Sequence, residues 1–258
     1  MFIDTHAHIH VKDFDADRAE VIKRALAANV SLINVGFDTL GNENAAKLAD
    51  ENKTIFWAGG YHPHHADLAT DENLKKLEEL ARGPYGKKLV ALGEMGMDYY
   101  RNLQPKQTQE VALRAQLKLA KKLDLPVIIH CRDAVADTLK ILADEKMTQV
   151  VFHCFTGTLE EAVACWNRGY MTSFTAICTY EKAGNIREVI KNAPVDKIML
   201  DSDCPYLAPQ KYRGKRNEPA YVFETFNKIA EVKNIQPKEL EKILFENTVK
   251  FFKLPITH

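Results

Sequence analysis

Short apolar runs rich in β-branched residues alternate along the chain with longer segments of helical periodicity. Helical patterns include 17–28, where Val21 and Ala25 repeat at i,i+4, and 107–123, where Val111, Leu113 and Leu117 recur on one side. The runs predict strands at 2–9, 31–37, 55–60, 89–94, 127–130, 150–153, 171–175 and 197–201. Eight strand–helix units in a chain of this length favour an α/β fold, a closed (β/α)8 TIM barrel of parallel strands.

An open doubly wound sheet is the alternative for such alternation. That fold usually has a glycine-rich turn after the first strand, whereas here the sequence reads His-Ala-His-Ile-His. Two more helical patterns, 220–233 and 237–253, follow the eighth strand, and no linker or low-complexity segment interrupts the chain. The sequence therefore predicts a single domain over residues 1–258.

Residues that can bind metal lie where the predicted strands end. Because the carboxyl ends of barrel strands converge on one face, we expect these side chains to meet there. His6 and His8 are two residues apart, so on a strand both imidazoles point the same way. The candidate ligands are His6, His8, Glu94, His130, His153 and Asp203.

Two carboxylates in this set follow apolar runs. Glu94 lies between Gly93 and Gly96 after 89–92, where burying a charge without a partner is costly and a cation is a natural partner. The same holds for Asp203, although Asp201 shares its strand period and the spacing leaves the choice between the two open.

Four histidines and two carboxylates exceed one tetrahedral catalytic site. We therefore expect two divalent cations, about 3.5–4 Å apart, that activate an attacking water. The candidates are Zn, Mn, Mg, Co and Ni, and the imidazole content favours the transition metals over Mg.

Nearby basic residues suit phosphate contacts. Arg132 follows His130, and the run 211–217 is rich in Lys and Arg. His62 and His64 follow the third strand and are candidates for phosphate contact or proton transfer. The aromatic residues Tyr99, Tyr100 and Tyr206 could stack on a base or simply pack.

Composition narrows the function further. The chain has 35 Lys+Arg and 35 Asp+Glu, which argues against a protein that coats nucleic acid by bulk charge. No apolar run approaches the ~18 residues that span a bilayer, no signal peptide is evident, and five cysteines without a Cys-x-x-Cys pair suggest reduced thiols. We therefore expect a cytoplasmic protein with no membrane contact and no obligate protein partner.

Six short motifs follow one another over nearly the whole chain, and the segment Arg213–Pro219 follows them. The motifs are Asp4-Thr5-His6-Ala7-His8, Gly60-Tyr61-His62-Pro63-His64, Gly93-Glu94-Met95-Gly96-Met97-Asp98-Tyr99, His130-Cys131-Arg132, His153-Cys154-Phe155-Thr156-Gly157 and Asp203-Cys204-Pro205-Tyr206-Leu207. Together they resemble the TatD family of metal-dependent deoxyribonucleases, whose fold is an amidohydrolase-type TIM barrel. The family usually has Glu where this chain has Asp201.

The resemblance implies a metal-dependent nuclease that hydrolyses DNA phosphodiester bonds, as a 3′–5′ exonuclease on single-stranded ends, with a place in DNA repair. It implies that Glu94 bridges the two ions, that Asp203 orients or deprotonates the attacking water, and that His62 and Arg132 contact substrate phosphate. The implied ligand sets are His6, His8, Glu94 and Asp203 for one ion, and Glu94, His130 and His153 for the other.

Two other functions fit the same residues. A metal-dependent amidohydrolase, lactonase or D-aminoacyl-tRNA deacylase would direct the same water to a carbonyl carbon. A metal-stabilised barrel without catalysis, serving as a binding module, would hold one ion and show no turnover.

Overall fold

Eight strands in one sheet carry the fold, as described for residues 1–256 by a computed structural model. The sheet follows the chain order from first to last, and the pairs β3–β4, β4–β5, β5–β6 and β7–β8 are parallel. The strands are β1 (Phe2–Ala7), β2 (Val30–Val35), β3 (Ile55–Gly59), β4 (Leu89–Asp98), β5 (Val127–Arg132), β6 (Val150–Phe152), β7 (Met171–Phe174) and β8 (Ile198–Leu200).

The last strand also returns to the first. The backbone N–H of Asp203 donates to the carbonyl of His6 (2.9 Å), and the N–H of His8 donates to the carbonyl of Cys204 (2.8 Å). A parallel bridge joins Ala7 to Cys204. Sequential strands that close on themselves make a (β/α)8 barrel, so the predicted fold class is confirmed.

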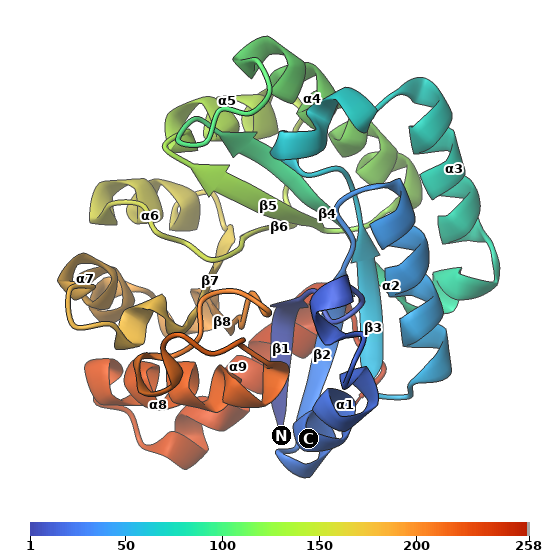
Figure 1. Ribbon diagram of the computed structural model, residues 1–258. Helices are drawn as coiled ribbons and strands as arrows, with labels where there is room; N and C mark the ends of the chain where they lie inside the picture. The colour runs from blue at the N-terminus through green and yellow to red at the C-terminus, as the bar shows by residue number, and fades with distance from the viewer. Residues whose placement is uncertain (257–258) are drawn as a thin grey trace. The chain divides into compact units, whose positions relative to one another are not determined.

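Helices alternate with the strands, and two follow β8 (Figure 1). None of them, within residues 1–256, combines the length and the apolar character needed to cross a membrane. The helices are α1 (Arg18–Ala27), α2 (Thr39–Glu51), α3 (Asp71–Arg82), α4 (Lys106–Leu123), α5 (Val135–Asp144), α6 (Leu159–Trp166), α7 (Gly184–Asn192), α8 (Val222–Lys233) and α9 (Pro237–Phe252).

The chain divides into two compact units, which we describe in turn. One comprises residues 34–153, and the other comprises residues 1–33 together with the chain from Cys154 onward. The prediction of a single domain over residues 1–258 stays a prediction.

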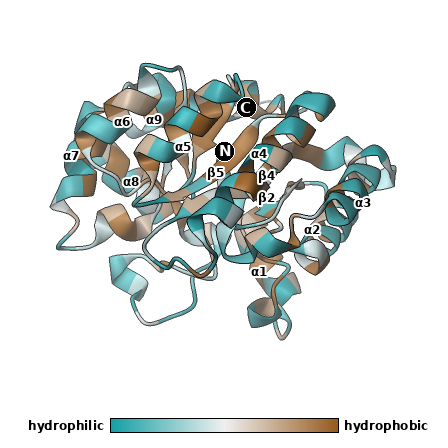
Figure 2. Cartoon of the chain, turned by 90° about the horizontal axis from the view of Figure 1, so that it is seen from above, coloured by the Kyte–Doolittle hydropathy of each residue, from teal (hydrophilic) through white to brown (hydrophobic). Residues whose placement is uncertain are grey.

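In the unit of residues 34–153, α2 packs on β3 and α4 packs on β4 (Figure 1). Its core includes the fully buried Trp57, Leu92 and Leu117. Figure 2 shows β5 in brown and most of α3 in teal, the division expected when the strand lies inside and the helix faces solvent. Asp38 caps α2 by accepting a hydrogen bond from the N–H of Gly41 (2.7 Å).

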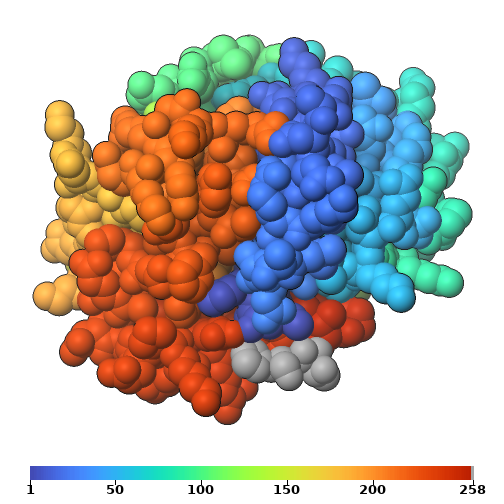
Figure 3. All heavy atoms as spheres, turned by 60° about the horizontal axis from the view of Figure 1, so that its bottom comes forward, coloured from blue at the N-terminus to red at the C-terminus, as the bar shows by residue number. Residues whose placement is uncertain are grey.

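In the other unit, α9 packs on β1 and β8. The loop after β8 packs on α1 and the turn before it, and Figure 3 shows this orange loop beside the blue N-terminal segment. Arg24 donates twice to the buried carboxylate of Glu218 (3.0 and 2.7 Å). Arg216 donates to the carbonyl of Asp13 (2.6 Å) and to Asp17 (2.7 Å). These charged contacts join the N-terminal segment to the loop that follows the last strand.

Most predicted strands differ from the observed ones by only a few residues at their ends, and β4 is the main exception. It was predicted to end at Glu94, but it continues to Asp98 because Gly96 to Asp98 pair with His130 to Arg132 of β5. Glu94 therefore lies inside its strand. β1 ends at Ala7, so His8 lies just beyond it.

The predicted apolar face of the helix over 107–123 is wrong at one position. Leu113 and Leu117 are fully buried, but Val111 is 63% exposed. At about 100° per residue, Val111 lies roughly 200° around the helix from Leu113 and faces the solvent.

This difference predicts unequal effects on stability. Leu117→Ala should lower the free energy of unfolding by about 2–5 kcal/mol, because it opens a cavity in the core. Val111→Ala should change it by less than about 0.5 kcal/mol. Urea unfolding followed by circular dichroism measures both, and equal losses would contradict the observed face of α4.

Candidate functional site

Two histidines meet at the end of β1. His6 and His8 are both buried, and their Nε2 atoms lie 3.2 Å apart. The spacing of two residues explains why both rings project to the same side. Two imidazole nitrogens at this distance cannot both carry a proton toward each other, so at least one presents a lone pair, as a metal ligand must.

Asp203 joins this pair from the loop after β8. Its φ of 51° shows that the chain has left the strand conformation, and its backbone N–H donates to the carbonyl of His6 (2.9 Å). The carboxylate then lies 3.6 Å from His8 Nε2. One ligand atom from each of His6, His8 and Asp203 falls within 4.8 Å of the others. These three residues are a candidate metal group.

The structure favours Asp203 over Asp201 as the ligand, a choice that the spacing left open. Asp201 is fully buried, and its Oδ2 accepts hydrogen bonds from the hydroxyl of Ser173 (2.8 Å) and the N–H of Cys154 (2.9 Å). Since β8 ends at Leu200, the strand period that made the two aspartates equivalent does not extend to Asp203.

Asp4 lies close to Asp201 and is also fully buried. Burial, and then the charge of Asp201, raise the pKa of Asp4 well above its usual range. Asp4 Oδ1 accepts hydrogen bonds from the N–H groups of His6 (3.2 Å) and Ser202 (2.9 Å). It thereby ties the backbone of one candidate ligand to the segment that leads to Asp203.

A second group gathers around Glu94, within the unit of residues 34–153. Its Oε1 lies 2.8 Å from His153 Nε2, 2.9 Å from His130 Nδ1 and 3.4 Å from His62 Nε2. The nitrogens of His130 and His153 that face Glu94 are themselves 3.3 Å apart. One carboxylate oxygen thus faces three imidazole nitrogens.

The electrostatics of this group favour an ionised Glu94. Burial raises the pKa of Glu94, but His62 and His153, with hydrogen bonds from His130 and His153, outweigh it and hold the pKa well below its usual range. Burial lowers the pKa of His62 well below its usual range, although the charge of Glu94 opposes this shift. A buried carboxylate with surrounding imidazoles is a donor set that fits a divalent transition-metal cation.

Asp98 orients His130 from the opposite side of the ring. Its Oδ2 lies 3.2 Å from His130 Nε2 and 2.8 Å from His64 Nε2, while its Oδ1 accepts the N–H of Arg101 (2.8 Å). A carboxylate on the far nitrogen of a histidine fixes the tautomer that offers the near nitrogen to a metal. No role was predicted for Asp98 from the sequence, although Glu94 and Asp98 share a strand face by period two.

Gly96 lies between them and lets β5 approach. Its φ is 151°, and a Cβ at this position would come within 1.9 Å of the carbonyl oxygen of His130. Only glycine fits there, so the strand face that carries Glu94 and Asp98 depends on Gly96.

The predicted substrate-binding residues have different surroundings. Arg132 is exposed at the end of β5, and its guanidinium lies 3.7 Å from the centre of the Tyr100 ring, which is 61% exposed. His62 Nε2 instead faces Glu94, in the second group, which surrounds that carboxylate. Contact of either residue with substrate stays a prediction.

Comparison with known proteins decides the family. A family model described as "TatD related DNase" matches residues 3–253. The chain belongs to the TatD family.

Its relatives match nearly end to end. This TatD-family protein is 40% identical over 257 residues to "Uncharacterized metal-dependent hydrolase YabD" of Bacillus subtilis (98% of this chain, 100% of the relative). It is 34% identical over 260 residues to "3'-5' ssDNA/RNA exonuclease TatD" of Pantoea vagans (97% and 99%).

A solved structure agrees. The structure of YJJV, a TatD homologue of Escherichia coli K12, superposes with a TM-score of 0.93 at 29% identity and covers 98% of each chain. The resemblance inferred from the six motifs is thus confirmed, and this TatD-family protein is a metal-dependent hydrolase.

Replacing Asp98 should weaken metal binding without touching a ligand. We expect Asp98→Asn to lower the affinity of the metal-stripped protein for Mn²⁺ or Zn²⁺ by roughly ten-fold or more, because the orienting charge on His130 is lost. Isothermal titration calorimetry measures this directly. Asp137→Asn, which changes an exposed aspartate bonded to the Tyr99 hydroxyl, is the matched control. Equal affinities in the two variants would exclude an orienting role for Asp98.

Proposed function

We propose that the protein hydrolyses DNA phosphodiester bonds as a 3′–5′ exonuclease on single-stranded ends, with two divalent cations. His6, His8, Glu94 and Asp203 would hold one cation, and Glu94, His130 and His153 the other. The observation that carries this proposal is the position of Glu94, whose Oε1 lies within 3.0 Å of the nearest nitrogens of both His130 (2.9 Å) and His153 (2.8 Å). A carboxylate so placed can share one cation with both histidines, and the family resemblance implies that it also reaches the other cation.

The donor set favours Zn, Mn, Co or Ni over Mg, because Mg prefers oxygen ligands and retained waters. When bound, such cations lower the pKa of water and neutralise the charge that develops on a phosphoryl group. His130 suits this role because Asp98 lies at its Nε2 (3.2 Å), which leaves Nδ1 to face the cation.

The tautomer of His62 supports a substrate contact rather than a ligand role. Its Nδ1 accepts a hydrogen bond from the N–H of His64 (3.0 Å), so the neutral ring carries its proton on Nε2. A protonated nitrogen cannot bind a metal, but it can donate to Glu94 Oε1, which lies 3.4 Å away, or to a phosphate oxygen. Arg132, exposed and braced on Tyr100, supplies a cation for the same phosphate.

Asp203 is the candidate base. It is only partly buried, unlike Asp4 and Asp201, and its carboxylate is 3.6 Å from His8. A carboxylate that reaches solvent beside the candidate ligands can orient the attacking water and accept its proton.

The substrate class rests on relatives and on charge. The relative from Pantoea vagans carries the name "3'-5' ssDNA/RNA exonuclease TatD", which supports a single-stranded substrate and this polarity. The balance of 35 Lys+Arg and 35 Asp+Glu suits an enzyme that holds a strand end through local contacts. None of the five cysteines forms a disulfide in the described part of the chain, which supports a cytoplasmic location; a place in DNA repair stays a prediction.

The decisive test is cleavage of end-labelled oligonucleotides by protein reconstituted with each candidate metal. Single-stranded DNA labelled at its 5′ end should give a ladder that shortens from the 3′ end, faster than duplex DNA or RNA of the same sequence. Faster turnover of D-aminoacyl-tRNA at equal metal would instead favour the carbonyl hydrolase.

Replacing Glu94 should strongly reduce the rate of cleavage. Glu94→Gln should lower the rate by roughly 10²–10³-fold or more, since the transition state loses a principal electrostatic support. Glu79→Gln, at an exposed position of α3, is the matched control and should retain full activity. Circular dichroism should show that both variants fold, and activity retained by Glu94→Gln would refute the bridging role.

A further inference from the structure

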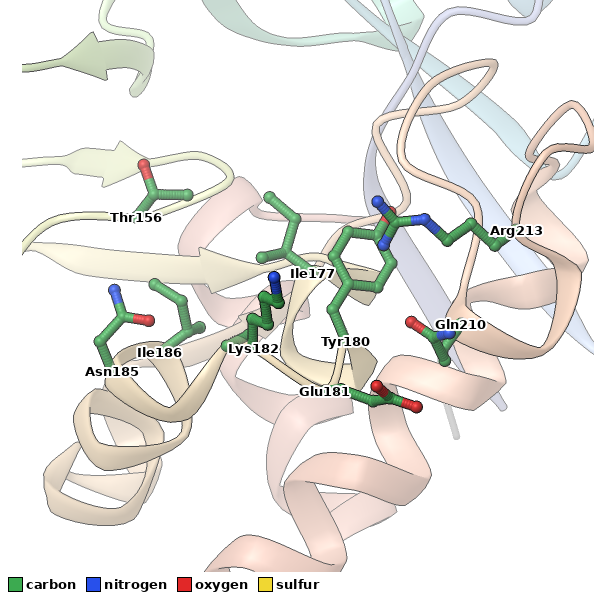
Figure 4. Close-up of a pocket in the computed structure, with 10 residues that line it drawn as sticks. Thr156, Ile177, Tyr180, Glu181, Lys182, Asn185, Ile186, Gln210 and Arg213 are labelled. Atoms are coloured by element: carbon green, nitrogen blue, oxygen red, sulfur yellow. The ribbon is translucent and has the colours of Figure 1, made fainter.

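A cavity of about 550 Å³ opens between three loops of the unit that contains β7 and β8 (Figure 4). These are the loop after β6, the segment from η4 (Ala176–Thr179) to the start of α7, and η6 (Gln210–Tyr212). Pockets for small ligands typically fall between roughly 300 and 1,000 Å³. No part of the mechanism above uses this cavity.

The loop that carries Asp203 continues into the wall of this cavity. The Tyr180 hydroxyl donates to the carbonyl of Ala208 (2.9 Å), and the N–H of Gln210 donates to Thr179 Oγ1 (2.9 Å). These bonds attach the far part of the Asp203 loop to η4 and the residues after it. One loop therefore supplies both a candidate catalytic carboxylate and a side of the cavity.

Two cations line the cavity. The guanidinium of Arg213 lies 4.6 Å from the centre of the Tyr180 ring, and Lys182 projects from the turn before α7 (Figure 4). Neither forms an ion pair with another residue in the part of the chain that the structure describes. Figure 4 shows the carboxylate of Glu181 directed away from Lys182. The cavity can therefore accept an anion at these two side chains.

The start of α7 adds to this preference. Its N-cap is Ala183, which offers no side-chain acceptor, and its first turn has no acidic residue. Backbone N–H groups and the helix dipole there favour negative charge.

The rest of the lining suits a flat heterocycle. Ile177, Ile186 and the ring of Tyr180 give apolar surface, and Asn185 and Gln210 offer amide groups that can both donate and accept hydrogen bonds (Figure 4). An aromatic and aliphatic surface beside adaptable amides, with cations at the rim, matches a nucleobase and its phosphate.

We propose that this cavity is a second substrate subsite, which holds one nucleotide of the bound strand away from the cleaved bond. Its base lies against Tyr180, Ile177 and Ile186, and its phosphate pairs with Arg213 and Lys182. The inference rests on the proposed nuclease function and adds a reason for preferring single strands. A base must be unpaired to enter, and unpairing a base of a duplex costs free energy.

Substrate length tests the subsite. Arg213→Gln and Lys182→Gln should each raise KM for a single-stranded octanucleotide roughly ten-fold, the effect of losing one charge-assisted contact. Both should leave kcat and KM unchanged for a dinucleotide, which spans only the cleaved bond. A plot of log(1/KM) for the octanucleotide against log[salt] has a negative slope. This slope should become less negative by about 0.7 for each lost phosphate contact.

Lys191→Gln is the matched control, because Lys191 lies on α7, the helix that follows Lys182, outside the cavity and exposed. It should behave as the wild type with both substrates, and thermal unfolding should show that all three variants fold. Variants that match Lys191→Gln on the octanucleotide would overturn the subsite while the nuclease function stands. A wild type that cleaves neither substrate with any metal would instead refute the nuclease function itself.

Discussion

A charged carboxylate inside a protein must be compensated, and the burial of Glu94 imposes this requirement on everything around it. Three imidazoles face its Oε1, and Asp98 in turn fixes the ring of His130. That arrangement needs β4 to extend past Glu94, which in turn needs a residue without a side chain at Gly96. The compensation of this one buried charge therefore depends on the extended strand, on Gly96 and on the second carboxylate, Asp98.

The loop after β8 combines several roles in a short segment. It begins with Asp203 beside His8, continues past the cavity at Arg213, and ends where Glu218 is held by Arg24. The ion pair between the buried Glu218 and Arg24 holds the far end of the loop on α1. The exposed residues of this loop therefore lie between two ends that are each bonded to the N-terminal segment.

Much of this arrangement could be predicted from the sequence, because it depends on local periodicity. The alternation of strands and helices predicted the barrel, and the two-residue spacing predicted that the rings of His6 and His8 lie on the same side. The orienting role expected of Asp98 was missed because the apolar run predicts a strand that ends at Glu94, and its extension to Asp98 depends on pairing with β5. Asp201 and Asp203 could not be separated, since the chain turns after Leu200 and local periodicity does not report that turn.

The bonds between the first strand and the loop after the last have a consequence for synthesis of the chain. The N–H of Ser202 donates to Asp4 across a separation of 198 residues. The group of His6, His8 and Asp203 therefore cannot form while the nascent chain is still short. Contacts this distant in sequence slow folding, because a large loop must close before they are made. A ribosome-bound fragment thus lacks part of this candidate metal group until Asp203 has been synthesised.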